Sequence, residues 1–506
     1  MIENKAAFNY TDLATIFGEE SFVNIPKIIE INSVVTDSRK IKNGNLFVAL
    51  VGEKIDAHSK LNEAFELGAK ICIVNENWYK EQKTIENEFV LSKFHSFSFI
   101  IVKNTLKSLG TLARFHRDRF NLPIIVVAGS NGKTTTKEMI VSVMSIKYNV
   151  LSTYKNFNNQ IGVPLMLLSL DDTYDCAVIE IATNSFGEIF YLATLVNPKY
   201  GVITNIGKEH LEILEDLDGV EMEETSLFAY LKKHLGFAFI NADDKRLIKY
   251  TNMLDNKLVY GQNELSEVIA KFNFDESLLP EVEIDIKGEK FFYKLKEIGL
   301  GNAYASVVAF SIGYKLEFDI NEICKKLSEF TTDYNSNYGR MRVEKYNLDN
   351  SKDLFNLTII NDCYNANPSS MQLALDSVNL IKENYQNVIL VLGEMRELGD
   401  KAIEEHQELI FNSNNISNNI IFHGNEFEVF FDGEKDKKFD ITKMSLEFQD
   451  KQISNTPLYF NDKNQIVNYL LNNIDNDKTN LILFKGSRGN ELENILINLK
   501  SNLKLN

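Results

Sequence analysis

The sequence predicts an α/β fold in which helices cover mostly parallel sheets, and two observations carry this prediction. Short β-branched or apolar runs alternate with longer stretches of helical periodicity, which is typical of parallel α/β sheets. The chain has 506 residues, too many for one hydrophobic core, since a domain usually holds about 100–200 residues. The runs expected to form buried strands are Ile71–Val74, Phe99–Val102, Ile124–Ala128, Ala177–Ile181, Gly201–Thr204, Thr358–Asn361, Val388–Leu392, Ile420–Phe422 and Leu481–Phe484.

Two changes in composition mark the expected domain boundaries. Near Lys103 a strand-like run gives way to the helical pattern TLKSLGTLARFHRDRF. The segment Thr331–Arg340, TTDYNSNYGR, is polar and rich in turn-forming residues. Further on, Asn412–Asn455 is rich in Asn, Asp and Lys, and we expect either a long surface insertion or a loosely ordered excursion there. The expected domains are 1–103, 104–330 and 331–506.

The overall composition argues against several classes of protein. A formal net charge of −17 disfavours nucleic acid as a main partner, because a phosphate backbone requires a basic surface. The first residues, MIENKAAFNYTDL, show no secretory signal, and no apolar run approaches the roughly 18 residues of a membrane span. We therefore expect a cytoplasmic protein. The four cysteines have no metal-binding or disulfide spacing and are expected to be small buried residues: Cys72, Cys176, Cys324 and Cys363.

The segment IIVVAGSNGKTTTKEMI predicts a phosphate-binding loop. A β-branched strand, Ile124–Val127, runs into AGSNGKTTT and then into a helix expected to begin near Lys133. Small loop residues allow backbone N–H groups to surround phosphate oxygens, and the helix N-terminus favours the same anion. The first Gly of the general pattern G-x-x-x-x-G-K-[ST] would fall on Val127, so the loop is a shorter variant, and an ordinary glycine-rich turn is the alternative. The candidate phosphate-binding residues are Gly129, Ser130, Asn131, Gly132, Lys133, Thr134 and Thr135.

Polar residues follow three other expected strands. Glu180 ends the strand AVIEI and suits Mg²⁺, although a helix-capping or solvated carboxylate is an equal alternative. His210 follows GVITNIG, where a structural histidine is the alternative to a metal ligand. NDCYNANPSSM (Asn361–Met371) follows LTII and is either a binding loop or a turn with a helix N-cap at Ser369. Because functional groups gather beyond the carboxyl ends of parallel strands, we expect these segments to meet.

Taken together, these segments resemble the Mur ligase family, from about Thr36 to Glu493. The phosphate loop alone fits any Mur ligase or a folylpolyglutamate synthase, whereas YNANP and LGEMRELG indicate the MurF type within the family. The segments that carry the resemblance are TDSRKIKNGNLFVAL (36–50), GSNGKTTTKE (129–138), NFNNQIGVPL (156–165), TNIGKEHLE (204–212), NADD (241–244), NDCYNANPSSM, VLGEMRELGD (391–400) with His406, and FKGSRG (484–489).

The resemblance implies a three-domain α/β protein: a smaller N-terminal domain, a central P-loop domain and a C-terminal Rossmann-like domain. It implies ATP and Mg²⁺ as cofactors and UDP-MurNAc-tripeptide and D-Ala-D-Ala as substrates. The two substrates would be joined through an acyl phosphate in peptidoglycan biosynthesis. We expect the protein to be a monomer. Three alternatives are another amide ligase of the same chemistry, an ATP-binding homologue that has lost catalysis, and a P-loop NTPase acting as a switch.

The resemblance also implies roles for nucleotide-binding residues. Lys133 and Thr134 would bind the ATP phosphates and Mg²⁺. Asn302, in GLGNAYAS, would contact adenine, Arg340 would reach the phosphates, and Asp362 would lie near the ribose.

Other positions are implied on the substrate side. Asp37, Ser38 and Arg39 would lie in the domain that holds the UDP end of the substrate. Asn365 and Asn367 match YNANP and are assigned to substrate binding without an individual contact.

The resemblance gives Glu180 and His210 as magnesium ligands and shows one departure. The family usually has a carbamylated lysine that supplies a carboxylate to a second magnesium ion. Glu224 occupies that position here, and Ser226 replaces the usual Glu. We hypothesise that Glu224 replaces the modified lysine, with a merely solvated Glu224 as the alternative. The expected catalytic residues are therefore Lys133, Glu180, His210 and Glu224.

Overall fold

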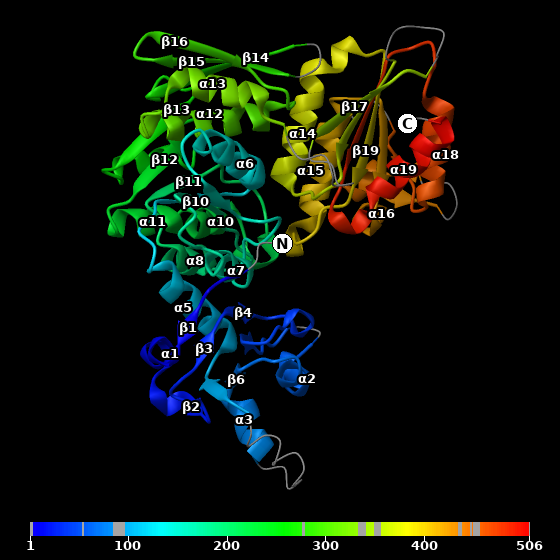
Figure 1. Ribbon diagram of the computed structural model, residues 1–506. Helices are drawn as coiled ribbons and strands as arrows, with labels where there is room; N and C mark the ends of the chain where they lie inside the picture. The colour runs from blue at the N-terminus through cyan, green and yellow to red at the C-terminus, as the bar shows by residue number, and fades with distance from the viewer. Residues whose placement is uncertain are drawn as a thin grey trace.

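The computed structural model shows three α/β domains, each built on its own sheet (Figure 1), which confirms the predicted fold class. The central domain lies beside the C-terminal domain and above the N-terminal one in this view. In the part of the chain that the structure describes, no helix combines the length and apolar character that a bilayer crossing requires. The described residues are 4–52, 55–83, 97–275, 279–331, 341–348, 356–433, 438–445, 448 and 456–504.

The N-terminal domain contains a five-stranded sheet in the order β2-β7-β6-β5-β4. Strands β4 to β7 are parallel, and β2 pairs with β7 in the antiparallel sense. A two-stranded sheet, β1 with β3, lies apart from it. The strands are β1 (Phe8–Asn9), β2 (Phe22–Val23), β3 (Glu30–Ile31), β4 (Ser33–Val35), β5 (Asn45–Val48), β6 (Ile71–Asn75) and β7 (Phe99–Val102), and the helices are α1 (Tyr10–Phe17), α2 (Leu61–Glu66) and α3 (Glu76–Lys83).

The central domain contains a nine-stranded sheet in the order β16-β15-β14-β13-β12-β11-β8-β10-β9. Strands β8 to β14 are parallel, and β15 and β16 extend the sheet as an antiparallel hairpin that sequence periodicity did not reveal. Strand β8 lies between β10 and β11, which places their carboxyl ends together. The strands are β8 (Ile124–Ala128), β9 (Val150–Ser152), β10 (Cys176–Glu180), β11 (Tyr200–Ile203), β12 (Phe237–Asn241), β13 (Lys257–Gly261), β14 (Val268–Phe274), β15 (Pro280–Ile286) and β16 (Glu289–Lys294).

Helices cover both faces of the central sheet. One buried cluster joins helix α5 and the N-terminal domain to one face, and a second fills the opposite face beneath α6, α12 and α13. Both faces of the parallel strands are buried, which accounts for their nearly continuous apolar sequence. The helices are α5 (Thr105–Arg117), α6 (Lys133–Met144), α7 (Gly162–Leu167), α8 (Glu188–Val196), α9 (Leu211–Leu214), α10 (Leu217–Glu224), α11 (Ser226–Lys233), α12 (Leu300–Lys315) and α13 (Ile320–Glu329).

The C-terminal domain contains an eight-stranded sheet in the order β17-β18-β24-β19-β20-β23-β22-β21. The five strands from β18 to β23 are parallel, whereas β17, β22 and β21 pair in the antiparallel sense. The elements are β17 (Arg342–Tyr346), β18 (Leu357–Asp362), β19 (Asn387–Gly393), β20 (Asn419–His423), β21 (Phe431–Asp432), β22 (Lys438–Phe439), β23 (Leu458–Tyr459), β24 (Asn480–Lys485), α14 (Pro368–Ile381), α15 (Ala402–Asn414), α16 (Asn425–Glu428), α18 (Lys463–Asn473) and α19 (Leu492–Leu503).

All nine runs expected to form strands fall on strands of the three sheets. The stretch 412–455 is not a single insertion, because β20 within it is a buried strand of the C-terminal sheet and β21 and β22 form a hairpin at its edge. The predicted boundary segment 332–340 lies outside the described residues. We propose domain boundaries near 103 and 330, which lie between the three sheets.

The central and C-terminal domains are joined by polar contacts around Lys208. Its ammonium lies 2.7 Å from Glu405 Oε1 and 3.0 Å from Glu408 Oε2. Its backbone N–H donates to Ser369 Oγ at 2.8 Å. The C-terminal domain is therefore docked beside the loop that follows β11.

A close backbone approach at Gly162 leads to a testable prediction. A Cβ atom on Gly162 would lie 2.4 Å from the Cα of Phe157 and 2.5 Å from its carbonyl carbon. We expect Gly162→Ala to reduce the free energy of unfolding by about 1–3 kcal/mol, seen as a lower midpoint of thermal unfolding. Gly301→Ala is the matched control, because its nearest neighbour, Leu373 Cδ2, would lie 3.5 Å away. A Gly162→Ala protein as stable as wild type would contradict the prediction.

Candidate active site

The loop after β8 requires glycine at two positions for different reasons. Gly129 has φ +110, and a Cβ there would lie 2.4 Å from Thr204 Oγ1 and 2.7 Å from the Thr204 backbone nitrogen. Gly132 has φ +78 with nothing within 4 Å of its Cβ position, so backbone conformation alone favours glycine there. Gly132 immediately precedes α6, which begins at Lys133 as predicted. Residues 130–135, at the end of the loop and the start of α6, line one cavity, whereas the amides of Gly129, Ser130 and Asn131 donate to Glu224 and Asn205.

The segment after β11 holds the loop in place. Ser130 Oγ accepts from Gly207 N–H at 2.8 Å and donates to the Gly207 carbonyl at 3.0 Å. The Asn131 carbonyl accepts from Thr204 Oγ1 at 2.7 Å and from Asn205 Nδ2 at 2.9 Å. These hydrogen bonds tie the loop to the segment after β11 and so fix the course of the loop backbone.

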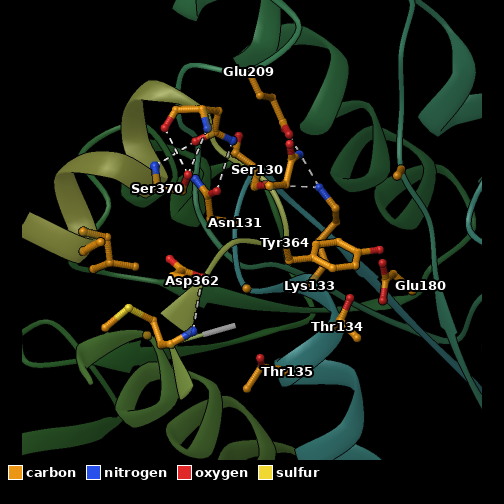
Figure 2. A pocket seen from close by; sticks show the side chains of 18 of the residues that line it. Ser130, Asn131, Lys133, Thr134, Thr135, Glu180, Glu209, Asp362, Tyr364 and Ser370 are labelled. Carbon is orange, nitrogen blue, oxygen red and sulfur yellow. Dashed lines mark hydrogen bonds and ion pairs between the residues drawn. The ribbon is translucent and has the colours of Figure 1, made fainter. Parts of the chain in front are cut away.

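The loop opens into a cavity of about 360 Å³ between the central and C-terminal domains (Figure 2). Lys133 reaches into it, where its ammonium donates to the Gly129 carbonyl and to the Ser130 carbonyl at 3.2 Å. The same ammonium lies 3.6 Å from Glu209 Oε2. The predicted residues that line this cavity are Ser130, Asn131, Gly132, Lys133, Thr134, Thr135, Glu180, His210, Asn302, Asp362, Asn365 and Asn367.

Two buried carboxylates in the cavity have an oxygen without a hydrogen-bond partner in the described part of the chain. Glu180 is 2% exposed; its Oε1 accepts from Asn158 Nδ2 at 2.9 Å, whereas Oε2 is unpartnered. Glu209 is 6% exposed, and its Oε1 is unpartnered. Glu209 was not predicted, although the TNIGKEHLE segment contains it. A buried carboxylate oxygen without a partner is unfavourable unless a cation or donor satisfies it.

These oxygens fit a magnesium site that is completed by other molecules. No group of three or more His, Cys, Asp or Glu side chains within the described ranges is close enough to hold a metal ion alone. Mg²⁺ in nucleotide sites is usually held by one or two carboxylates together with phosphate and water oxygens. Glu180 and the hydroxyl of Thr134, which also lines the cavity, are oxygen donors of this kind.

His210 lies at the edge of the same cavity. Its Nδ1 is 2.5 Å from Glu397 Oε2 of the C-terminal domain, and its Nε2 is 3.9 Å from Glu209 Oε2. Burial alone would lower the pKa of His210. The hydrogen bond that the His210 ring donates to Glu397 and the charges of Glu209 and Glu397 outweigh that effect and hold the pKa of His210 above its usual value.

The C-terminal domain contributes the opposite wall. Asp362 at the end of β18 and Lys485 at the end of β24 form a buried ion pair at 2.5 Å. Lys485 was missed as a cavity residue, although FKGSRG places a lysine at a strand end. Asn367 Nδ2 donates to Asn131 Oδ1 at 3.1 Å and so joins this wall to the phosphate loop.

Helix α14 begins one residue after Asn367. The N-cap of α14 is Asn367, not Ser369, because Pro368 occupies the first helical position and the Asn367 side chain accepts from Ser370 N–H. Arg340 lies outside the described residues. Asn302 lines the cavity and donates from Nδ2 to the Ile298 carbonyl at 2.6 Å.

The predicted DSR residues lie elsewhere, in the N-terminal domain. Asp37 caps a short turn and binds the Arg39 guanidinium at 2.9 Å; this hydrogen bond lowers the pKa of Asp37. The Arg39 side chain is 83% exposed, and Ser38 is buried. Of the three, only Asp37 lines a second cavity of about 760 Å³, to which Lys40 and Lys42 also contribute. The two lysines follow directly in DSRKIK but were not predicted.

Comparison with known proteins decides the family. A family model described as the Mur ligase middle domain matches residues 127–313, and one described as the Mur ligase, glutamate ligase domain matches 339–488. A UDP-N-acetylmuramoyl-tripeptide–D-alanyl-D-alanine ligase of Buchnera aphidicola subsp. Baizongia pistaciae is 30% identical over 471 residues, which cover 92% of each chain. The relative of that name in Bacillus subtilis is 30% identical over 470 residues and 93% of each chain. This chain belongs to the Mur ligase family.

Solved structures agree with this assignment. MurF from Acinetobacter baumannii matches this Mur ligase with a TM-score of 0.80 at 26% identity, over 98% of this chain and 100% of that one. MurF from Thermotoga maritima, solved in complex with ADP, matches with a TM-score of 0.73 at 24% identity over 93% and 97% of the two chains, and this likeness shows the fold.

Glu224 of this Mur ligase lies directly behind the phosphate loop and not in the cavity. It is fully buried, and its Oε2 accepts from Gly129 N–H at 2.8 Å, whereas Oε1 has no partner among the described residues. Burial raises the pKa of Glu224 to about 8, with the charge of Lys133 opposing the shift and that of Glu209 adding to it. The alternative of a merely solvated Glu224 is therefore wrong, because the side chain has no contact with solvent.

The raised pKa of Glu224 leads to a prediction about stability. The folded protein binds this proton more tightly than the unfolded chain, whose pKa is near the ordinary 4.5. Stability is therefore lost as the pH rises from 4.5 to about 8, by up to about 1.4 kcal/mol per pH unit. We expect metal-free Glu224→Gln protein to exceed wild type in thermal midpoint at pH 8 and to match it at pH 5.

The control for this measurement is Glu215→Gln, which changes an exposed carboxylate beside the same helix. Its thermal midpoint should follow that of wild type at both values of pH. The prediction would be contradicted if the difference in thermal midpoint between Glu224→Gln and wild type were the same at pH 5 and pH 8.

Proposed function

We propose that this Mur ligase is an ATP-dependent, ADP-forming enzyme that joins D-alanyl-D-alanine to UDP-N-acetylmuramoyl-tripeptide in peptidoglycan biosynthesis. The names of relatives that match over more than nine-tenths of the chain support this reaction. The structural observation that supports it best is a single segment, Tyr154–Asn158, that lines both the phosphate-loop cavity and the cavity of the N-terminal domain.

This segment suggests how one long substrate spans two domains. Lys155, Asn156 and Asn158 line the phosphate-loop cavity, whereas Tyr154 and Phe157 line the N-terminal cavity. A nucleotide sugar held in the N-terminal cavity could extend its peptide along the segment, so that the terminal carboxylate reaches the phosphate loop. The apolar and aromatic lining and the nearby lysines suit a nucleoside diphosphate.

In the proposed reaction, the tripeptide carboxylate attacks the γ-phosphorus of ATP, and ADP leaves with the bridging oxygen. The amine of the dipeptide then attacks the acyl carbon, phosphate leaves, and the amine loses a proton. Lys133 offsets the negative charges that meet in the first step, after its ammonium leaves the loop carbonyls for the phosphate oxygens. The position of the cavity between two docked domains limits the access of water to the acyl phosphate.

We propose that Thr134, Glu180 and His210 hold magnesium, which, when bound, offsets phosphate charge and orients the phosphates. The carboxylate that the family obtains by lysine carbamylation would be replaced by Glu224, which acts through the Gly129 amide behind the loop. Glu209 adds a second carboxylate on the cavity side of Lys133. With the carboxylates of Glu224 and Glu209 in place, a carbamylated lysine would be unnecessary.

The remaining assignments follow from the same proposal. We assign Asn302 to the adenine, Asp362 to the ribose, and Arg340 to the phosphates. We assign Asp37, Ser38 and Arg39 to the UDP side. Asn365 and Asn367 are assigned to the substrate near the reacting groups. Because one copy of the chain contains both cavities, we propose that the monomer is active, and that it works in the cytoplasm, where ATP is supplied.

The first test is release of ADP by the purified protein with Mg²⁺ and ATP. We expect ADP to form at a substantial rate only when UDP-MurNAc-tripeptide and D-Ala-D-Ala are both present, because the acyl phosphate is consumed only by the amine. A coupled assay for ADP measures the rate, and omission of each substrate is the control. Equal ADP release without either substrate would indicate a P-loop switch and overturn the proposal.

The second test concerns Glu224. In buffer depleted of CO₂, the wild-type rate should not respond to added bicarbonate, because no lysine has to be carbamylated. Glu224→Gln should lower the rate by about 10- to 100-fold, and bicarbonate should not restore it. Glu215→Gln, an exposed neighbour, should keep the wild-type rate. A wild-type rate in Glu224→Gln would exclude the proposed replacement.

A further inference from the structure

The motif VLGEMRELGD (391–400) has no part in the reaction as described above, yet Glu397 within it contacts the candidate metal ligand His210. Glu397 Oε2 lies 2.5 Å from His210 Nδ1. His210 follows β11 of the central domain and Glu397 follows β19 of the C-terminal domain. The Glu212 N–H also donates to the Glu397 carbonyl at 3.1 Å. The contact between the domains therefore involves both side chain and main chain.

This contact fixes the orientation of the His210 ring. An ionised carboxylate can only accept, so Nδ1 is the donor nitrogen and, in the neutral ring, Nε2 keeps its lone pair. Nε2 is the nitrogen on the side of Glu209, whose Oε2 is 3.9 Å away, and both residues line the phosphate-loop cavity. A carboxylate that holds one ring nitrogen while the other faces a metal is the usual way in which a histidine ligand is oriented.

The backbone on both sides of the contact has an uncommon conformation. His210 has φ 48 and Glu397 has φ 63, both in the left-handed region that residues with a side chain rarely adopt. Such conformations persist where the surroundings hold them. Gly399 has φ 53, and a Cβ on it would lie 3.0 Å from the Cα of Glu212. The two domains therefore approach closely at this point.

A buried histidine, His406, holds the main chain just before Glu397. His406 is fully buried, and its Nε2 accepts from the Met395 N–H at 3.0 Å. Its Nδ1 lies 2.7 Å from the Ala402 carbonyl, which requires a proton on Nδ1 and leaves Nε2 as the acceptor. The main chain two residues before Glu397 is thus tied to helix α15, which moves with the C-terminal domain.

We propose that Glu397 is a positioning residue that orients His210 toward the phosphate-loop cavity only when the C-terminal domain is docked. Docking of this domain then completes the metal site, so the site has its full affinity for a divalent cation only in the closed molecule. The proposal rests on the proposed function, because it assigns His210 to the metal of that reaction. Glu397 itself touches neither substrate nor metal and acts through His210.

The test measures binding of Mn²⁺, in place of Mg²⁺, to the full chain saturated with a non-hydrolysable ATP analogue, by electron paramagnetic resonance. Glu397→Ala should weaken Mn²⁺ binding about tenfold. Glu397→Gln keeps an acceptor oxygen at the same distance and should recover part of the loss. The matched control is Glu404→Ala, which removes an exposed carboxylate of the same domain and should bind Mn²⁺ as wild type does.

A double-mutant cycle separates positioning from a general structural role. His210→Ala alone should weaken Mn²⁺ binding, and adding Glu397→Ala should cause no further loss, because the ring on which Glu397 acts is gone. If Glu397→Ala does not fold, Glu397→Gln in the same cycle should show a smaller loss that also disappears in the His210→Ala background. Wild-type affinity in the Glu397 variants, or equal losses with and without His210, would overturn the proposal.

The binding measurement uses neither the acceptor nor the amine, so its outcome does not depend on which amide the enzyme forms. If wild type releases no ADP with both substrates but the cycle gives the expected coupling, the proposed function fails and the role of Glu397 stands. If wild type ligates and the cycle shows no coupling, the opposite conclusion follows.

Discussion

The loop between β8 and α6 is the constraint on which the rest of the site depends. Gly129 is packed so closely against Thr204 that a side chain would overlap the backbone. On its other side the Gly129 amide is held by the buried carboxylate of Glu224. The loop is therefore fixed from both neighbouring segments before any ligand arrives. Lys133 is carried by this loop, so its reach into the cavity is set by the same contacts.

Buried carboxyl groups are concentrated around Lys133. Glu180, Glu209 and Glu224 are all buried, and each has one oxygen without a partner among the described residues. Burying an unsatisfied carboxylate is unfavourable, and it persists where a bound cation satisfies the group during function. The same buried carboxyl groups therefore lower the stability of the metal-free protein and give it the capacity to bind a divalent cation.

Docking of the C-terminal domain brings the second half of the site into place. Asn367 joins the phosphate loop, Lys208 joins α15, and Glu397 joins His210. Asn131, Asn367 and His210 line the cavity into which the loop opens, whereas Lys208 and its partners on α15 line a separate pocket between the same two domains. Separation of the two domains would therefore open the cavity wall and at the same time free the His210 ring from Glu397. The proposed metal site and the docking of the domains are linked by geometry, because His210 takes part in both.

The sequence alone determined the strands, the phosphate loop and the residues at strand ends, because apolar periodicity and glycine-rich turns are local properties of the chain. It did not reveal the β15–β16 hairpin, whose exposed edge weakens that pattern, nor Glu209, Lys485 and Glu397. These residues have ordinary local sequence and gain their importance from partners about 75 to 190 residues away. Only the tertiary structure decided them, because burial and charge pairing depend on which distant segments the fold brings together.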